Sequence, residues 1–180
     1  MVVTHTNEIP TFAPESKLYR PPQHFFRTGL GRFATGVAVI TFDAAANDRR
    51  GITINSFTSI SMDPPLVLAA IGRQTRSHDA LRDRPFAVNI LGAEQQALAM
   101  QFAGKPTLEP RFVEGEHAPR LEHVLSWFEC TPWAAYAGGD HTMFLGEVRR
   151  YGSRRGDALG FLGGRFLTIP EADLGHEELF

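Results

Sequence analysis

The stretch that decides the fold is GITINSFTSISMDPPLVL, residues 51–68. Its first part is rich in small hydroxyl and amide side chains, and only Met62 and Asp63 separate this polar ribbon (residues 51–61) from Pro64-Pro65 and an apolar strand. Such side chains satisfy backbone groups on edge strands and in turns. They also suit a flat, polar ligand, so the residues alone leave a structural and a binding role open.

The composition indicates one soluble globular domain, because 180 residues with 43% hydrophobic and 21% charged side chains can bury a core unaided. A net charge of −2 argues against a nucleic-acid partner. The single cysteine, Cys130, excludes an internal disulfide and lies in the apolar segment LSWFEC, which predicts a buried structural thiol. Without a signal peptide or a spanning segment, we expect a cytoplasmic protein that does not enter a membrane.

Patterning along the chain predicts an N-terminal arm over residues 1–22, a folded domain over 23–170 and a C-terminal tail over 171–180. Strands are expected at 36–42, 51–61, 65–71, 85–91, 121–130, 142–151 and 161–169, with a hairpin turn at 45–50. A helix after Pro22 would place Phe25, Phe26, Leu30 and Phe33 on one face.

Two further helices are expected. Ser77 would cap a short one, with Asp79 in its first turn. The segment 93–104 would turn Ala97, Leu98 and Phe102 inward and stop at Gly104. Many strands and few short helices predict a mainly β, antiparallel fold, most simply a barrel.

Other chemistries find little support in the sequence. GLGRFATG at 29–36 has the wrong glycine spacing for a dinucleotide fingerprint, and it follows a helical segment instead of a strand. His117 and His123 have no cysteine or acidic partner at a spacing typical of a metal site. No G-x-S-x-G elbow indicates a serine hydrolase.

The motifs mean more in their order: TGVAVIT, GITINSFTSISMDPPLVL, RSHDALRDRPFAVNIL, GGDHTMFLGEVRRY and LGFLGGRF. This succession, over about residues 24–167, resembles the flavin reductase-like family, whose members feed reduced flavin to two-component monooxygenases. The resemblance implies an FMN-binding split barrel, a homodimer and a flavin pocket near the subunit interface. It also implies FMN or FAD and NADH or NADPH as cofactors, with a flavin-dependent monooxygenase as partner.

Site residues follow from the same resemblance. The flavin ring and ribityl chain would lie against two strands, at Thr35, Gly36, Val37, Thr53, Asn55, Ser56, Phe57 and Ser59. Arg76 and Ser77 match the segment that meets the phosphate, and His141 matches a histidine associated with the nicotinamide nucleotide. Arg165 and Phe166 match a C-terminal segment that closes on the pocket. No catalytic side chain is expected, because the cofactors supply the reactivity.

The sequence departs from the family pattern in a short 105–120 loop and in Gly163 and Arg165 of FLGGRF. Both departures bear on the nicotinamide contacts more than on the flavin contacts. The alternatives are an electron carrier of the flavoredoxin kind, which holds its flavin tightly and does not use NADH, and an oxidase of the pyridoxamine-phosphate type. The second is weakened because no basic phosphate cluster is evident.

Overall fold

The structure is a computed structural model that describes residues 22–106 and 108–171. The predicted arm (1–22) and tail (171–180) lie outside the described residues, apart from Pro22 and Glu171. Within the described part, no helix combines the length and apolarity needed to cross a membrane.

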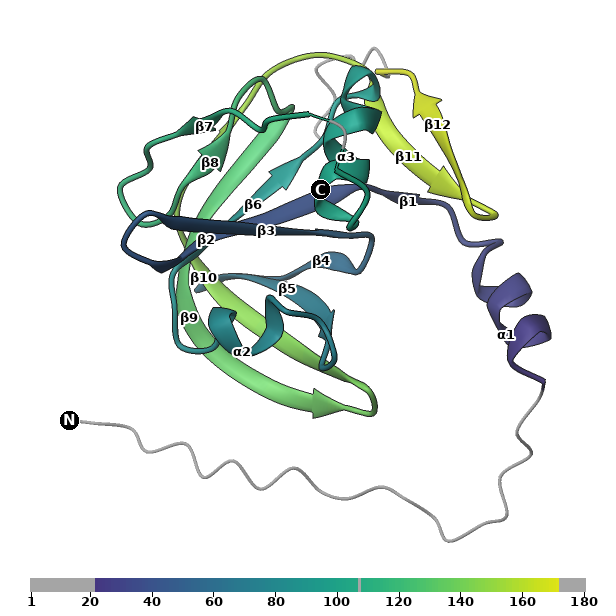
Figure 1. Cartoon of the computed structure of the whole chain (residues 1–180), viewed down its shortest axis with the longest axis horizontal. Coiled ribbons are helices and arrows are strands. Elements are labelled where there is room, and N and C mark those ends of the chain that lie inside the picture. The colour runs from purple at the N-terminus through teal and green to yellow at the C-terminus, as the bar shows by residue number, and fades with distance from the viewer. Residues whose placement is uncertain (1–21, 107, 172–180) are drawn as a thin grey trace, which may run out of the picture.

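Seven strands form one antiparallel sheet in the order β3-β2-β6-β9-β10-β5-β4. In chain order they are β2 (Ala38–Ala45), β3 (Asp48–Ile54), β4 (Phe57–Met62), β5 (Pro65–Gly72), β6 (Phe86–Ile90), β9 (Ser126–Gly138) and β10 (His141–Ser153). The sheet curls so that its two edge strands, β3 and β4, face each other without pairing (Figure 1). The predicted antiparallel split barrel is therefore confirmed, as is the hairpin between β2 and β3.

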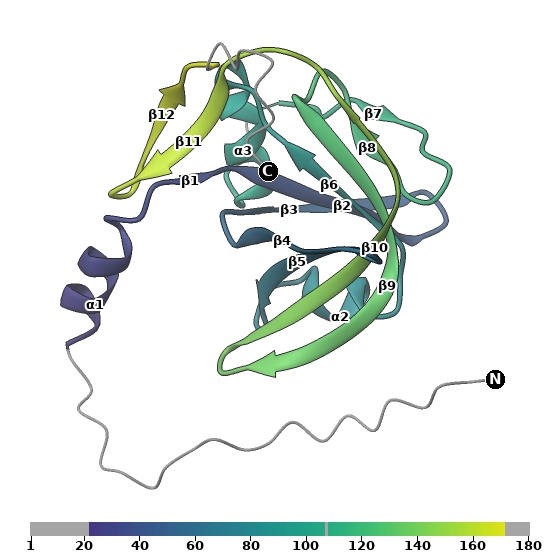
Figure 2. The same cartoon turned by 180° about the vertical axis from the view of Figure 1, so that it is seen from behind.

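A second sheet holds β1 (Thr35–Gly36), β11 (Ala158–Leu162) and β12 (Arg165–Ile169) beside the barrel, where both views show it (Figures 1 and 2). The strand predicted at 36–42 is confirmed from Ala38 onward as β2, but it is not continuous, because the chain changes sheets at Val37, whose N–H donates to Leu159 O. The segment 161–169 is the end of β11, a turn and β12. Gly163 and Gly164 form that turn with φ of +58° and +81°, which glycine adopts without strain.

The helices are shorter than predicted. α1 (Gln23–Leu30) begins after Pro22, but it ends before Phe33 and buries no residue. α2 (His78–Leu81) has Ser77 at its N-cap position without a side-chain cap bond, and Asp79 in its first turn.

The segment 93–104 is a 3-10 turn, η1 (Ala93–Gln95), followed by α3 (Gln96–Phe102). Ala99 is its buried residue, Leu98 and Phe102 are half-buried, and Ala97 is exposed, which corrects one of the three inward positions. The looser 105–120 stretch contains β7 (Phe112–Val113), which pairs with β8 (Arg120–Leu121).

Two apolar clusters make the core, one inside the barrel around Ile40, Phe42 and Phe86 and one beneath α3 around Val39 and Leu91. A buried amide joins them to the β7–β8 loop. Asn89 donates to Val39 O and to Thr41 Oγ1, each at 2.9 Å, and its Oδ1 accepts from Leu121 N at 2.9 Å. Because a buried amide is costly unless bonded, this network fixes the loop against the barrel.

The predicted burial of Cys130 is confirmed, since its side chain is fully enclosed. Burial, reinforced by neighbouring Glu129, raises the thiol pKa from 9.0 to about 12. Because only the thiolate attacks disulfide reagents, we expect no reaction with Ellman's reagent in the folded protein at pH 8 and one equivalent after unfolding. Rapid labelling of the folded protein would contradict this burial.

Candidate functional site

A small, mostly apolar pocket of about 200 Å³ lies between the barrel and the β11–β12 hairpin. It is lined by Val37, Thr53, Ile54, Asn55, Ala103, Phe161 and Phe166. The two phenylalanine rings meet edge to face with centroids 5.4 Å apart. The pocket is smaller than the roughly 300–1,000 Å³ typical of ligand sites, so it can hold only part of a large flat ligand.

Strand β1 supplies two unusual positions directly before Val37, which lines this pocket. Thr35 Oγ1 is buried and has no hydrogen-bond partner among the described residues. Gly36 is exposed, and a Cβ built there would meet no atom within 4 Å. An unpaired buried hydroxyl next to an open backbone position is the arrangement expected where a polar ligand completes the wall.

The polar ribbon is only partly available to a ligand. Thr53 Oγ1 donates to Ala99 O and Ser56 Oγ donates to Ala70 O, both at 2.7 Å. Phe57 stacks on Phe128 at 5.9 Å and packs against the barrel core, which favours a structural role over a flavin contact. Ser59 is exposed on edge strand β4, and Asn55 is exposed between β3 and β4 with its amide unbonded among the described residues.

A second group of predicted residues gathers at the end of β5. A tight turn before His141 is confirmed, but its residues are Gly139 and Asp140, because Gly138 ends β9 and pairs with His141. His141 opens β10 opposite Gly72. The half-exposed His141 ring is oriented by a 2.7 Å contact between its Nδ1 and Asp140 Oδ1. This hydrogen bond, together with the His141 charge, lowers the pKa of Asp140.

Arg76 and Ser77 follow β5 closely and begin α2. Arg76 is exposed with no ion-pair partner among the described residues, whereas Ser77 is buried. With four residues, α2 is too short to provide a strong dipole, so any anion bound here would rely on the Arg76 guanidinium.

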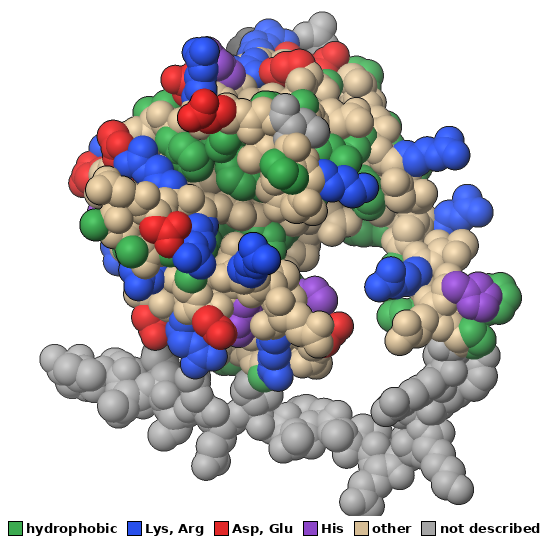
Figure 3. All heavy atoms as spheres, in the orientation of Figure 1, with side chains coloured by type: hydrophobic (Ala, Val, Ile, Leu, Met, Phe, Trp, Pro, Cys, Tyr) green, Lys and Arg blue, Asp and Glu red, His purple; other side chains and the backbone are tan. Residues whose placement is uncertain are grey.

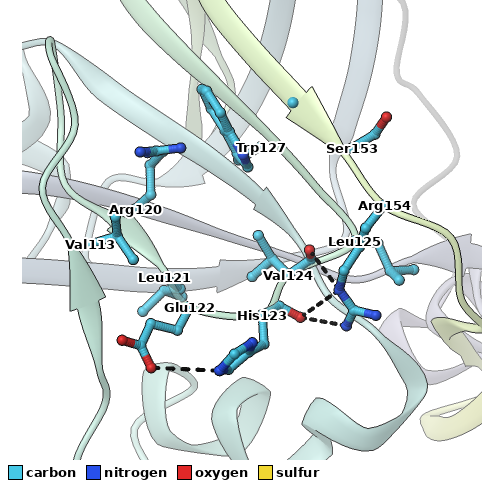
Figure 4. A pocket seen from close by; sticks show the side chains of 11 residues that line it. Val113, Arg120, Leu121, Glu122, His123, Val124, Leu125, Trp127, Ser153 and Arg154 are labelled. Atoms are coloured by element: carbon cyan, nitrogen blue, oxygen red, sulfur yellow. Dashed lines mark hydrogen bonds and ion pairs between the residues drawn. The ribbon is translucent and has the colours of Figure 1, made fainter.

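A larger groove of about 510 Å³ lies elsewhere, beside β8 and the ends of β9 and β10 (Figure 4). Its polar side chains already have partners within the chain. Arg120 stacks on Trp127 at 3.8 Å, and Arg154 donates to His123 O and Val124 O. None of the predicted site residues lines this groove, and its geometry indicates a structural role.

Comparison with known proteins places this geometry in a family. Residues 30–170 match the flavin reductase like domain. The chain belongs to this family. It is 40% identical to an NADH-dependent FAD reductase of Streptomyces globisporus, over 92% of this chain and 97% of the relative. It is 39% identical to the FMN reductase (NADH) SmoA of Agrobacterium fabrum, over 78% of this chain and 83% of the relative.

Solved structures agree with the family assignment. The flavin reductase PheA2 in its native state superposes with a TM-score of 0.80 at 33% identity, covering 84% of this chain and 100% of that one. The Streptomyces globisporus NADH:FAD oxidoreductase in complex with NAD and FAD fragments gives 0.78 at 36% identity, covering 89% and 100%. The resemblance recognised from sequence motifs is thereby confirmed.

Sequence reasoning missed several residues that shape the pocket. Ile54, Ala103 and Phe161 line it, although none was expected there. The alternation of the 161–169 segment could have indicated Phe161, had its glycine pair been interpreted as a hairpin turn. Ala103 carries no sequence signal, because its place depends on how α3 packs over β3.

Because the Thr35 hydroxyl is unpaired, its removal should have opposite effects on stability and on flavin affinity. Thr35→Val keeps the shape but removes a buried group that lacks a partner, so we expect the unfolding free energy of the flavin-free protein to rise by about 1 kcal/mol. Flavin affinity should fall several-fold, because a ligand hydrogen bond is lost. Chemical denaturation and fluorescence titration measure the two effects. A fall in stability with unchanged affinity would show that the hydroxyl has a structural role only.

Proposed function

We propose that this protein is an NAD(P)H:flavin oxidoreductase that reduces FMN or FAD. The unpaired Thr35 hydroxyl beside the open Gly36 backbone carries this proposal. These positions directly precede Val37, which lines a pocket with Phe161 and Phe166 where a flat ring can pack. The names of the relatives support the same activity.

The side chains suit binding and orientation. A bound flavin accepts hydride from a nicotinamide, so the protein itself need only hold the two rings in contact and exclude water. Asn55 offers an unbonded amide to the ring edge. Ser56 donates its proton to Ala70 O and therefore faces a ligand as an acceptor.

The polar ends of the cofactors would meet charged or oriented groups. We propose that Arg76 and Ser77 meet the flavin phosphate and that His141, whose ring contacts Asp140, meets the nicotinamide nucleotide. None of the residues that line the ring pocket is charged, which favours exchange of the flavin over permanent retention. We therefore infer that reduced flavin leaves for a partner monooxygenase. Relatives described as reductase components of such monooxygenases support this partner.

The proposed assembly is a homodimer. Helix α1 stands away from the barrel across an open hollow (Figure 3), and Phe25, Phe26, Leu30 and Phe33 are 57–77% exposed. An isolated helix of eight residues is marginal in water, so α1 needs a surface to pack on. We propose that a second copy supplies it next to β1, and thereby encloses a flavin that the 200 Å³ pocket cannot hold alone. Sedimentation should give twice the chain mass, and a monomer would contradict the assembly.

The proposed setting is the reducing cytoplasm, which suits a chain whose single thiol is buried and unpaired.

Activity is tested by measuring oxidation of NADH and of NADPH with FMN, FAD and riboflavin as acceptors. We expect oxidation that depends on added flavin, and the matrix identifies the preferred nucleotide and flavin. A yellow protein that oxidises neither nucleotide would instead indicate a flavoredoxin-like electron carrier.

The proposed role of His141 predicts that its replacement weakens binding of the nicotinamide nucleotide and leaves flavin binding unchanged. His141→Ala should raise the KM for the nicotinamide nucleotide by roughly tenfold, since an oriented hydrogen bond is worth about 1–2 kcal/mol. The flavin dissociation constant should stay within about twofold, because no flavin contact is lost. Glu122→Ala serves as a control, because Glu122 lies beside the solvent-exposed His123 in the groove next to β8, where no predicted site residue is found. An equal loss of affinity for both cofactors would contradict this role.

A further inference from the structure

A second cavity, of about 680 Å³, lies where the end of α1 meets the tip of the β11–β12 hairpin. It is lined by Arg27, Thr28, Gly31, Arg32, Leu162, Gly163, Gly164 and Arg165. The two segments are joined directly, because Gly163 N donates to Gly31 O at 2.8 Å. No carboxylate is among the lining residues, and Figure 3 shows basic side chains without acidic ones along this edge.

The three arginines of this cavity lack a counter-charge. Arg27, Arg32 and Arg165 make no ion pair within residues 22–106 and 108–171, whereas many other arginines, such as Arg50 and Arg154, pair with a carboxylate. Arg27 is partly explained by its place in the last turn of α1, where a cation favours the helix dipole. Arg32 and Arg165 have no such explanation. Guanidinium groups bind phosphate oxygens, often through two hydrogen bonds, and three of them line this one cavity.

The cavity adjoins the ring pocket through both of its walls. Arg165 directly precedes Phe166, which lines the ring pocket, and Arg32 lies five residues before Val37, which also lines it. At roughly 3.3 Å per extended residue, the first link spans about 3 Å and the second at most about 17 Å, and a ribosyl or ribityl arm can cover the shorter of them. Arg165 and Phe166 point to opposite faces of their strand, so such an arm must pass around the hairpin tip. The Gly163–Gly164 turn leaves room there, because a Cβ at either glycine would meet no atom within 4 Å.

We propose that this arginine cavity binds the diphosphate of a dinucleotide cosubstrate whose ring either lies at the aromatic pocket, as in FAD, or stacks on the flavin ring there, as in a nicotinamide dinucleotide. The inference rests on the proposed reductase function and adds to it a second anion site, separate from Arg76 and Ser77. The diphosphate could belong to the nicotinamide dinucleotide or to FAD, and the chemistry of recognition is the same for both.

The test is a double variant, Arg32→Gln/Arg165→Gln, with Arg82→Gln/Arg111→Gln as a control that removes the same charge from outside this cavity. Both targets are exposed and unpaired, so the fold should persist. Calorimetry with ADP as the probe measures the site without turnover. We expect ADP to bind the unmodified protein and the control alike, and the double variant at least about tenfold more weakly.

Steady-state kinetics of the double variant identify which dinucleotide supplies the diphosphate. A rise in KM for NADH but not for reduced nicotinamide mononucleotide assigns it to the nicotinamide dinucleotide. A rise for FAD but not for riboflavin assigns it to the flavin. The proposal is overturned if ADP does not bind the unmodified protein, or if it binds the double variant equally well. ADP binding in a protein that oxidises no nucleotide would support the anion site and contradict the reductase function alone.

Discussion

Gly36→Leu is expected to weaken flavin binding severely while the protein stays folded. The glycine is exposed, its backbone lies outside the left-handed region, and a Cβ meets no atom within 4 Å. A leucine side chain therefore fits the cofactor-free protein and occupies the space where a flavin ring would contact the backbone. We expect the flavin dissociation constant to rise by about a hundredfold, equivalent to about 2.7 kcal/mol, in a fluorescence titration.

Smaller substitutions should give a graded result, with Gly36→Ala weakening binding less than Gly36→Leu. Ala45→Leu is a control, because Ala45 is also exposed but lies at the last position of β2, at the other end of that strand from the pocket. Thermal unfolding of the flavin-free proteins checks that the fold is kept. Normal flavin affinity in Gly36→Leu would exclude the ring from this face of β1.

Arg120→Ala is expected to cause the largest loss of stability. Glu129 is 1% exposed, and its carboxylate lies 3.0 Å from Arg120 Nε while it accepts a hydrogen bond from His117 N. Removal of the guanidinium leaves a buried charge without its cation, and it also removes the stacking on Trp127. We expect the free energy of unfolding to fall by about 3 kcal/mol. This value is at the lower end of the cost of breaking a buried ion pair, because Arg120 is itself partly exposed. The melting temperature should fall by roughly 6–12 °C.

The solvent-exposed pair between Arg150 and Glu116 provides the control. Arg150→Ala should cost less than about 1 kcal/mol, since water and salt screen such pairs. In Arg120→Ala/Glu129→Gln, much of the stability should return, because the uncompensated charge is gone. Equal effects of Arg120→Ala and Arg150→Ala in denaturant titrations would show that the buried pair does not hold the β7–β8 loop.

The sequence predicted the barrel well because its strands alternate regularly and end at clear turns. The apolar segment after Pro64-Pro65 and the GGDH turn became β5 and the β9–β10 hairpin as expected. The prediction failed at Val37, where an unbroken β pattern conceals a change of sheet. It also failed for α1, whose apolar face suggested a packed helix although no residue of α1 is buried in the single chain.

The site was predicted less completely for a physical reason. The sequence does not reveal which hydroxyl groups form hydrogen bonds within the folded chain. The hydroxyls of Thr53 and Ser56 donate to backbone carbonyls, whereas the hydroxyl of Thr35 has no partner among the described residues. The arginine cavity likewise depends on one hydrogen bond between Gly31 and Gly163, which lie near opposite ends of the described chain. Sequence spacing cannot predict such a meeting without the strand pairing of β1 with β11.

The central claim is that flavin is a substrate which leaves the protein after reduction. The most direct measurement is anaerobic reduction of a large molar excess of free FMN or FAD by NADH, followed through loss of the visible flavin absorbance. We expect the moles of flavin reduced to exceed the moles of protein many-fold. Reduction that stops at one flavin per chain would contradict the account and indicate a protein that keeps its flavin.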